Sequence, residues 1–318
     1  MTSTTEVAAD WDAIDARHRR ELLGYCYRML GSPFDAEEAV QETLVRAWRG
    51  HGSFAGNSSL RVWLFRIATN VCLDLLRQRP RRERPVDVAA ASDANTSLGT
   101  AEPDRWVQPA PGRWLLPPTA DPADTAVRRD SIRLAFVAAL HHLSPMQRAV
   151  LLLRDVLAFS AVETSALLDI TVAAANGLLR RARRTLADEP AQPDSAAELT
   201  EQQRALLDRF VDAFERQDVP ALTALLHEDA TLSMPPYLLW LAGRAAIEQW
   251  FRRDPNPCQN ATVIPVDANG APAFAIYHGA QPFGLLLVTV RDNGIAALDM
   301  HIDPRLFALF VDSGLCAP

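Results

Sequence analysis

Three helix-start signals follow one another within residues 143–186, and they restrict the fold of this chain more than any other feature. Ser144 precedes a proline and is followed three residues later by Gln147, and Ser160 with Glu163 repeats the arrangement. In this capping box the hydroxyl accepts a hydrogen bond from the third helical N–H, while the Glu or Gln side chain bonds back to the cap. The spacing therefore predicts two helices that begin at these serines.

A third helix is predicted from Thr171, after a tight turn at Asp169. Aspartate adopts the left-handed backbone conformation more readily than most residues, so the second helix should end there. One face of the third helix is apolar at spacings of three and four, and it comprises Val172, Ala175, Leu179, Ala182 and Leu186. The opposite face carries Ala173, Asn176, Gly177, Arg180, Arg181 and Arg184.

The polar face of this third helix suits a helix that reads DNA. Small residues near its start allow close entry into a major groove, and Asn and Arg form paired hydrogen bonds with adenine and guanine edges or bind phosphates. The same residues also fit a solvated basic face on a structural helix. The pattern predicts a helix-turn-helix and leaves both interpretations open.

The composition bounds the class of protein. A chain of 318 residues is long enough for two or three small domains. Its four cysteines are far apart, which indicates neither a disulfide framework nor a zinc site, and we expect no metal and no cofactor. The N-terminus is acidic, and no apolar run approaches the roughly 20 residues that span a bilayer, so we expect a cytoplasmic protein that does not enter the membrane.

Charge is distributed unevenly along the chain. Residues 1–190 contain 24 arginines and 23 acidic residues, whereas residues 191–318 contain 8 and 16. Within the first part, arginines cluster at 77–84 and again at 180–184. Two basic clusters predict two contacts with nucleic acid, and the acidic remainder predicts a domain with another role.

Three helices are expected before residue 80. The first spans residues 10–30; the second, DAEEAVQETLVRAWR, is expected to be capped by Asp35 and has a polar face that by itself fits an ordinary solvated surface. The third follows a polar loop, and there Trp63 shares a face with polar side chains such as Asn70. A flat aromatic ring beside polar groups suits the binding of an unpaired base, although a helical Trp is more often part of a core.

Eight prolines fall between Pro80 and Pro122, where no periodicity is sustained. We predict a linker at 81–125, because so long a loop is uncommon inside a compact domain. Its motif WVQPAPGRWLLPP is apolar enough to dock on another surface. A helix at 126–141 is expected to lead into the helix-turn-helix.

The pattern changes again after a second, shorter linker that follows Glu189. Thr200 with Gln203 starts a helix, and further helices are expected at 219–226 and 243–253. The β-prone runs are DATLSMP, ATVIPVDA, PAFAIYH, FGLLLVTVR and IAALDMHID, with a hairpin signal at 292–294. The expected fold is an α+β domain in which a curved sheet wraps around a helix with an apolar interior.

The order and spacing of these segments resemble an extracytoplasmic-function (ECF) sigma factor of bacterial RNA polymerase with a C-terminal SnoaL-like domain. DAEEAVQETLVRAWRG is similar to the family's polymerase-binding helix, FAGNSSLRVWLFRIATNVCLDLLRQRPRR to its promoter-melting and −10-reading segment, and residues 143–186 to its −35-reading module. HEDATLSMPP and DPRLFALF resemble the SnoaL-like extension. The resemblance implies two all-α sigma domains, the second a helix-turn-helix, followed by an α+β domain with a cone-shaped sheet. Implied boundaries are region 2 at 1–80, the linker at 81–125, region 4 at 126–189 and the SnoaL-like regulatory domain at 198–318.

The resemblance also implies roles for individual residues. Contacts with core polymerase fall on Asp35, Glu38, Gln41, Glu42 and Arg46. Promoter melting and −10 binding fall on Phe54, Asn57, Ser58, Trp63, Arg66 and Asn70. Contacts with the −35 element fall on Asn176, Gly177, Arg180, Arg181 and Arg184. The expected partners are core RNA polymerase and promoter DNA, without a separate anti-sigma factor.

These observations predict a sigma factor that is not an enzyme and that its C-terminal domain regulates in cis. SnoaL relatives include isomerases, so a small-molecule ligand or an enzyme in this domain is an alternative, and Asp299, His301 and Tyr277 are its candidate cavity residues. No persuasive acid/base pair supports that alternative. A stand-alone DNA-binding regulator is a second alternative, which the polymerase-binding helix argues against.

Overall fold

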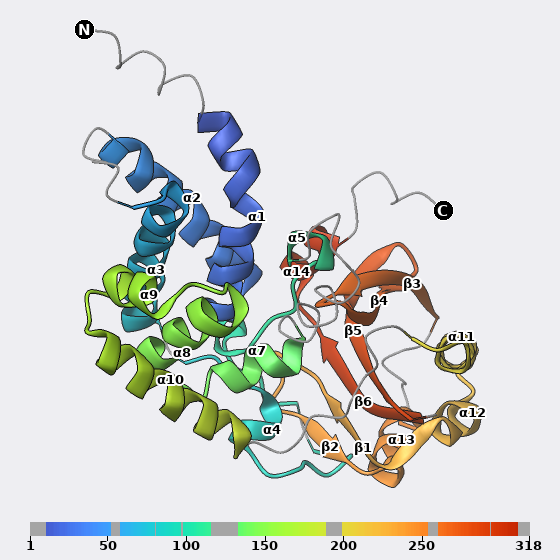
Figure 1. The fold of residues 1–318 in the computed structure, drawn as a ribbon. Coiled ribbons are helices and arrows are strands. Elements are labelled where there is room, and N and C mark those ends of the chain that lie inside the picture. The colour runs from blue at the N-terminus through green and yellow to red at the C-terminus, as the bar shows by residue number, and fades with distance from the viewer. Residues whose placement is uncertain are drawn as a thin grey trace, which may run out of the picture. The chain divides into compact units, whose positions relative to one another are not determined.

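The computed structural model describes residues 11–51, 58–79, 81–96, 98–115, 133–188, 199–253, 260–292 and 294–310. The chain divides into two compact units. The first comprises residues 1–82 and 113–190, and the second comprises residues 83–112 and 191–318. Figure 1 shows that the first unit is helical and that the second is built around a sheet.

The first unit begins with α1 (Trp11–Leu30), α2 (Pro33–Gly50) and α3 (Leu60–Gln78). The expected cap of α2 at Asp35 is wrong, because the helix begins three residues earlier. Ser32 is the cap, its side chain accepts a hydrogen bond from the Asp35 N–H, and a proline occupies the first helical position. A proline fits there since its ring presets the helical φ and the missing N–H has no partner inside the helix.

Gly31 ends α1 at a position where only glycine fits. Its φ is +72°, and a Cβ added there would lie 2.5 Å from Nε2 of His141. His141 is itself buried, and burial lowers its pKa well below the usual value. The turn between the first two helices thus packs directly against the second half of the unit.

The second half of the first unit contains α7 (Leu134–Leu140), α8 (Pro145–Leu151), a π-helical turn (Leu152–Val156), α9 (Ala161–Leu168) and α10 (Val172–Ala187). Both predicted capping boxes are present, and the left-handed turn residue Asp169 has φ 54° and ψ 47°. These predictions are confirmed. The helix expected at 126–141 is described only from residue 134, since residues 116–132 lie outside the described part of the chain.

The second unit contains α11 (Glu201–Glu215), α12 (Val219–Ala224), α13 (Arg244–Phe251) and α14 (Pro304–Phe310) around one six-stranded sheet. Its strands are β1 (Leu226–Ser233), β2 (Trp240–Ala242), β3 (Ala261–Ala268), β4 (Ala271–His278), β5 (Gln281–Arg291) and β6 (Gly294–His301), in the order β2-β1-β6-β5-β4-β3. β1 and β6 are parallel and the other pairs are antiparallel. The predicted α+β fold is confirmed, while the short β2 and α14 are additions that the β-prone and helical patterns did not predict.

The inner face of the sheet forms the core of the second unit with α11 and α13. Leu298 and Phe274 from the sheet join Phe210, Phe214 and Trp250 from the helices in one buried cluster. The outer face lies against α14, where the Tyr277 and Phe307 rings meet edge to face at 4.7 Å. Residues on alternate positions of each strand therefore belong to two separate environments.

Candidate functional site

The polar face of α2 is exposed at most of the positions expected to contact polymerase. Glu38, Gln41 and Arg46 are exposed and Glu42 is half-buried. Nε of Arg46 donates a hydrogen bond to Oε1 of Glu42 at 2.6 Å, one turn away. Because Arg46 and Glu42 pair with each other along the helix, this face presents both signs of charge to a partner.

Asp35 lies inside the unit rather than on this face. Asp35 is 7% exposed, and its carboxylate forms ion pairs with Arg79 and with Nη2 of Arg82, the latter at 2.8 Å. Removing one partner of such a buried pair leaves an uncompensated charge, which typically costs about 3–5 kcal/mol. The geometry makes Asp35 a residue that fixes the start of α2 against the end of α3.

Two apolar side chains on α2 are exposed beside the polar ones. Trp48 is 60% exposed and Val45 is 39% exposed. With Gln41 they follow spacings of three and four, so they share one face of the helix. Sequence reasoning missed both; the available signal was an aromatic ring on the polar face of an amphipathic helix.

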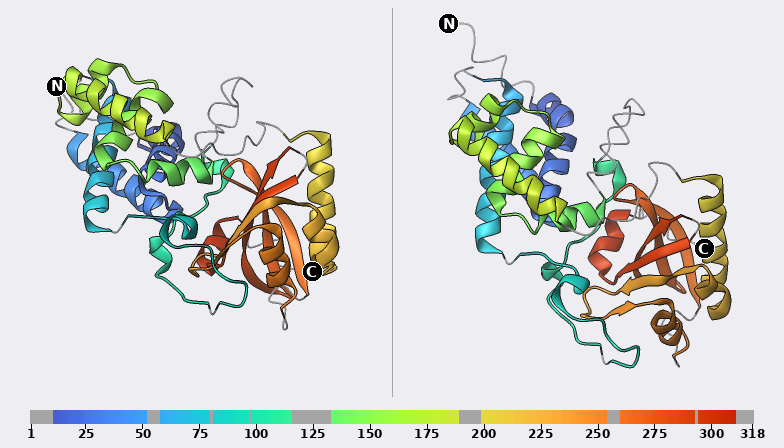
Figure 2. Two further views of the ribbon diagram at one scale, coloured as in Figure 1. Left: turned by 90° about the horizontal axis from the view of Figure 1, so that it is seen from below. Right: turned by 60° about the horizontal axis from the view of Figure 1, so that its bottom comes forward.

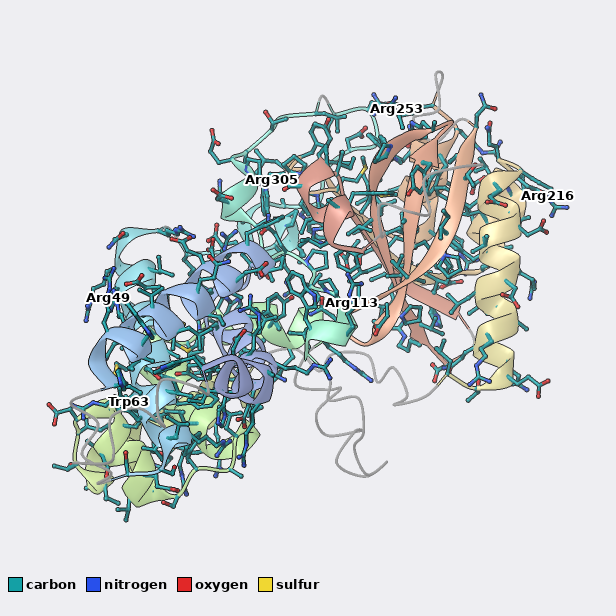
Figure 3. The ribbon with its side chains drawn as sticks, turned by 90° about the horizontal axis from the view of Figure 1, so that it is seen from above. Arg49, Trp63, Arg113, Arg216, Arg253 and Arg305 are labelled. Atoms are coloured by element: carbon teal, nitrogen blue, oxygen red, sulfur yellow. The ribbon has the colours of Figure 1, made fainter. Side chains whose placement is uncertain are left out.

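The face of α3 expected to hold unpaired DNA has a mixed environment. Arg66 and Asn70 are exposed, Trp63 is half-buried, and Ser58 is exposed just before the helix. Figure 3 marks Trp63 in the first unit. Phe54 and Asn57 lie outside the described residues. Of the expected set, the structure therefore places Trp63, Arg66 and Asn70 on α3, with Ser58 just before it.

The helix-turn-helix has the geometry that its sequence predicts. α9 and α10 meet at a bend of 100°, within the range of such motifs. On α10, Ala175, Leu179 and Ala182 are buried. Val172 was expected in this buried stripe but is 39% exposed, like the other residues of the first turn of α10, which are exposed from 171 to 174.

The opposite face of α10 is open. Asn176, Arg180, Arg181 and Arg184 are all exposed, and Gly177 is half-buried. A Cβ added at Gly177 would meet nothing nearer than Nη1 of Arg181, at 3.6 Å. Arg183 is different, since its guanidinium pairs with Asp155 at 2.7 Å. Four basic or amide side chains of this helix thus point to solvent while Arg183 ties the helix to the π-helical turn.

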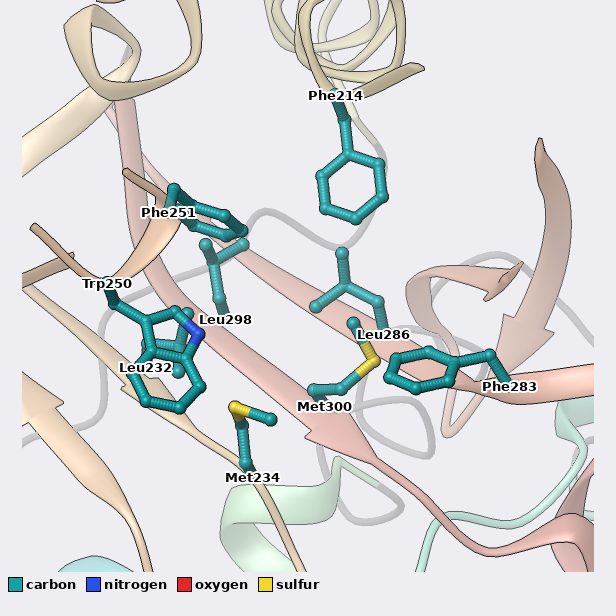
Figure 4. Close-up of a pocket in the computed structure, with 9 residues that line it drawn as sticks. All are labelled: Phe214, Leu232, Met234, Trp250, Phe251, Phe283, Leu286, Leu298 and Met300. Carbon is teal, nitrogen blue, oxygen red and sulfur yellow. The ribbon is translucent and has the colours of Figure 1, made fainter. Parts of the chain in front are cut away.

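The second unit has a small apolar cavity on the inner face of its sheet. It measures about 20 Å³, close to the room that one water molecule needs. Figure 4 shows the nine side chains that line it, which are Phe214, Leu232, Met234, Trp250, Phe251, Phe283, Leu286, Leu298 and Met300. None carries an ionisable group, so this cavity supplies no acid or base.

The candidate acid/base residues lie on the other face of the sheet. On β6, Leu298 and Met300 line the cavity, and the alternate residues Asp299 and His301 point away from it. The Ser233 hydroxyl hydrogen-bonds to Asp299 at 2.6 Å, and burial raises the pKa of that carboxyl. Burial lowers the pKa of His301 to about 4. The expectation that Asp299, His301 and Tyr277 line this cavity is therefore wrong.

The described residues also bear on metal binding and on membrane insertion. Among them, no group of three or more His, Cys, Asp or Glu side chains is arranged to hold a metal ion. Within the same part of the chain, no single helix is long and apolar enough to cross a membrane, and only the bent pair α9 and α10 meets that test jointly.

Three family models match the chain in succession. They are Sigma-70 region 2 at residues 14–82, Sigma-70 region 4 at residues 133–186 and the SnoaL-like domain at residues 207–296.

Individual proteins match over most of the chain. The ECF RNA polymerase sigma factor SigG of Mycobacterium tuberculosis is 40% identical over 322 residues, which cover 96% of this chain and 84% of SigG. The crystal structure of the Mycobacterium tuberculosis ECF sigma factor SigJ matches with a TM-score of 0.57 at 20% identity, over 93% of this chain and 97% of SigJ. A structure of the sigma factor RpoE from Bartonella quintana, solved with the anti-sigma factor NepR, matches at a TM-score of 0.37 and 24% identity, over 56% of this chain and 95% of RpoE.

Proposed function

This chain belongs to the family of ECF RNA polymerase sigma factors, and on that premise we propose which of its surfaces performs each step of initiation. As a sigma factor it binds core RNA polymerase and directs promoter-specific transcription initiation, and its SnoaL-like domain fits a regulator in cis. We place region 2 at 1–80, the linker at 81–125, region 4 at 126–189 and the regulatory domain at 198–318.

Core polymerase binds the exposed face of α2. Glu38, Gln41, Glu42 and Arg46 give this face its polarity, and the exposed Trp48 adds a large rigid contact of the kind that dominates interface energies. Asp35 acts indirectly, because its buried ion pairs hold the helix in place.

Promoter opening uses the loop before α3 and the α3 face with Trp63, Arg66 and Asn70. Melting requires no catalytic group; it requires a site that binds an unstacked base well enough to offset a few kcal/mol of unpairing. The exposed amide and guanidinium and the half-buried indole on this face are the kinds of group that such a site uses, which supports the proposal. We assign Phe54, Asn57 and Ser58 to the same site by their place in the chain.

Region 4 reads the −35 element with α10. The observation that carries this assignment is the exposed set Asn176, Arg180, Arg181 and Arg184 on a helix whose start and turn are fixed by capping. Gly177 contributes close approach and no base contact. Arg183 is excluded from the DNA-reading set, since it is paired with Asp155.

The C-terminal domain acts as a regulator and not as an enzyme. Support comes from the cavity, which is apolar and about 20 Å³ in volume, and from the position of Asp299 and His301 on the opposite sheet face. A small-molecule ligand would need a larger cavity than this conformation offers. That this chain has no separate anti-sigma factor stays a prediction. Sigma factors in general do not share that property, because RpoE was solved in complex with the anti-sigma factor NepR.

Run-off transcription tests the proposal directly. The purified full chain, with core polymerase and a template that carries the upstream region of its own gene, should give a discrete transcript. The matched control replaces Arg180 and Arg181 with alanine, and a second control replaces the paired Arg183. The assignment would be refuted if the same transcript appeared without the chain, or if the variant without Arg180 and Arg181 gave as much transcript as wild type.

A further inference from the structure

Residues 83–106 form a closed loop in the second unit, which we name the reservoir loop. Glu83 and Trp106 pair as parallel β-bridge partners, although they are far apart in sequence. The Glu83 N–H donates to the Arg105 carbonyl at 2.9 Å, and the Val107 N–H donates to the Glu83 carbonyl at 3.0 Å. The two ends of the loop therefore lie side by side.

The middle of the reservoir loop is hydrogen-bonded to β2 and to the segment that precedes β2. The Ser92 N–H donates to the Trp240 carbonyl at 2.8 Å, and the indole N–H of Trp240 donates to the Ala89 carbonyl at 2.8 Å. Further along, the Ala101 N–H donates to the Pro236 carbonyl at 3.0 Å. Figure 2 shows the reservoir loop, in teal, as a looped segment beside the orange strands β1 and β2.

At its C-terminal end the loop continues into residues 106–110, which pack in the interior of the second unit and which we name the anchor. Trp106, Val107 and Ala110 are buried, and the Ala110 N–H donates to Oδ1 of Asn269 at 2.8 Å. By contrast, most of the described side chains between 86 and 104 are exposed, and among them Ala94 is the one that joins the hydrophobic core cluster. Segments with exposed side chains and few buried contacts open at lower free energy than buried ones. The loop can therefore open while the anchor stays docked.

The loop lies in the covalent path between the two promoter-binding domains. Region 2 ends where the loop begins, and region 4 follows it. While Glu83 and Trp106 are paired, residues 84–105 add nothing to the reach of that path. Released and extended, they would add up to roughly 75 Å.

We propose that the C-terminal domain controls initiation by storing linker length in the reservoir loop, and that opening the loop lets regions 2 and 4 reach both promoter elements. This inference rests on the proposed assignment of the two regions to the −10 and −35 elements. Elements so named lie about 25 base pairs apart, on the order of 85 Å along the duplex. With the loop closed, the path between the regions is limited to the docked span of residues 106–112 plus at most about 70 Å from residues 113–132 when these are fully extended.

Contacts inside the first unit show the arrangement that must open. Nη1 of Arg148, in region 4, donates to the Met29 carbonyl in region 2. Nη2 of Arg61, in region 2, donates to the Leu157 carbonyl in region 4 at 3.0 Å. The two regions thus pack on one another in this conformation, and a longer path is needed only after they separate.

A length variant tests the proposal. Residues 86–103 are replaced by two glycines, which keeps the Glu83–Trp106 pairing and removes the stored length. The matched control replaces the same residues by a Gly/Ser sequence of the original length. Both are assayed by run-off transcription with core polymerase, beside wild-type protein and a measurement of polymerase affinity.

We expect the shortened variant to lose at least tenfold in transcript while it binds polymerase like wild type, and the equal-length control to match or exceed wild type. Full activity of the shortened variant would overturn the proposal, and so would an equal loss in both variants. Failure of wild-type protein to initiate would instead count against the proposed function.

A second pair covers the case in which the shortened variant does not fold. Ser92→Pro with Ala101→Pro removes the N–H donors to the Trp240 carbonyl of β2 and to the Pro236 carbonyl before β2, whereas Ser92→Ala with Ala101→Ser keeps them. The proline pair should be cut faster by trypsin after Arg105 and should give several-fold more transcript. Faster cleavage with unchanged transcript would overturn the proposal.

Discussion

The guanidinium carbon of Arg61 lies 4.1 Å from the centroid of the Phe159 ring. Arg61 belongs to α3, and Phe159 belongs to the turn before α9. The same guanidinium pairs with Glu21, and the Phe65 ring meets Phe159 edge to face at 5.4 Å. One arginine therefore connects α1 and α3, which belong to region 2, with the turn before α9, which belongs to region 4.

We predict that Arg61 and Phe159 are energetically coupled. A double-mutant cycle with Arg61→Met and Phe159→Leu should give a coupling on the order of 0.5–1 kcal/mol in urea unfolding of the full chain, as expected for a partly exposed cation–π pair. Arg66→Met on the exposed side of the same helix provides the control, and it should be additive with Phe159→Leu. Additivity in both cycles would show that the contact contributes nothing.

The exposed indole of Trp48 leads to a prediction about polymerase binding. Trp48→Ala should weaken affinity for core polymerase by about 2 kcal/mol, or roughly 30-fold, because an exposed Trp at the centre of an interface is a typical hot spot. The melting temperature should change little, since the side chain has few contacts inside the protein. Val162→Ala, at the most exposed large apolar side chain among the described residues, is the control and should bind normally. If Trp48→Ala bound core polymerase as tightly as Val162→Ala, the exposed face of α2 would be ruled out as the polymerase-binding surface.

Local signals made much of the helical part predictable. The capping boxes at Ser144 and Ser160 and the left-handed turn at Asp169 depend on residues three or four apart, and all three were predicted. The cap of α2 was misplaced because Asp35 and Ser32 are both good capping residues. The structure selects Ser32, whereas the Asp35 carboxylate pairs with Arg82 from 47 residues away.

Long-range pairing explains what the sequence did not reveal. Prolines and missing periodicity led to the prediction of a linker at 81–125. Within it, the bridge between Glu83 and Trp106 and the hydrogen bonds to Trp240 and Pro236 depend on partners distant in sequence. The alternation along β6 separated Leu298 from Asp299. It did not tell which face α11 and α13 would cover, so Asp299 was assigned to the wrong side.

Promoter opening should depend on Asn70 more than promoter binding does. Asn70→Ala, and Trp63→Ala with it, should slow open-complex formation at a duplex promoter and leave closed binding nearly unchanged, because both side chains are proposed to contact unpaired bases only. A pre-melted template should restore transcription. Gln78→Ala, at an exposed position near the end of the same helix, is the control. If the variants initiate normally on duplex templates, this face does not take part in melting.

The arginines of α10 should differ in their effect on −35 recognition. Arg180→Ala and Arg181→Ala should each cost about 1–3 kcal/mol at one base position if they read bases, or a uniform loss with a shallower salt dependence if they bind phosphates. Arg183→Ala is the matched control, because its side chain pairs with Asp155. Footprints at increasing salt separate the two cases. Unchanged −35 protection by both variants would mean that another element reads the promoter.

Acidification should destabilise the C-terminal domain through His301. Burial lowers the pKa of His301 to about 4 in the folded protein, although the charge of Asp303 raises it in part. In the unfolded chain a histidine titrates near 6.5, so between these two values the unfolded state binds more protons than the folded state.

The stability contributed by the neutral ring is therefore complete above about pH 7 and is lost as the pH falls from about 6.5 towards 4, by up to about 1.4 kcal/mol per pH unit. His301→Gln cannot take up this proton. We therefore compare the melting temperatures of the variant and of wild type at the same pH. The variant should fall furthest below wild type at pH 7.5, and it should approach or exceed wild type at pH 5. A constant difference between pH 7.5 and pH 5 would show that His301 is not held neutral by burial.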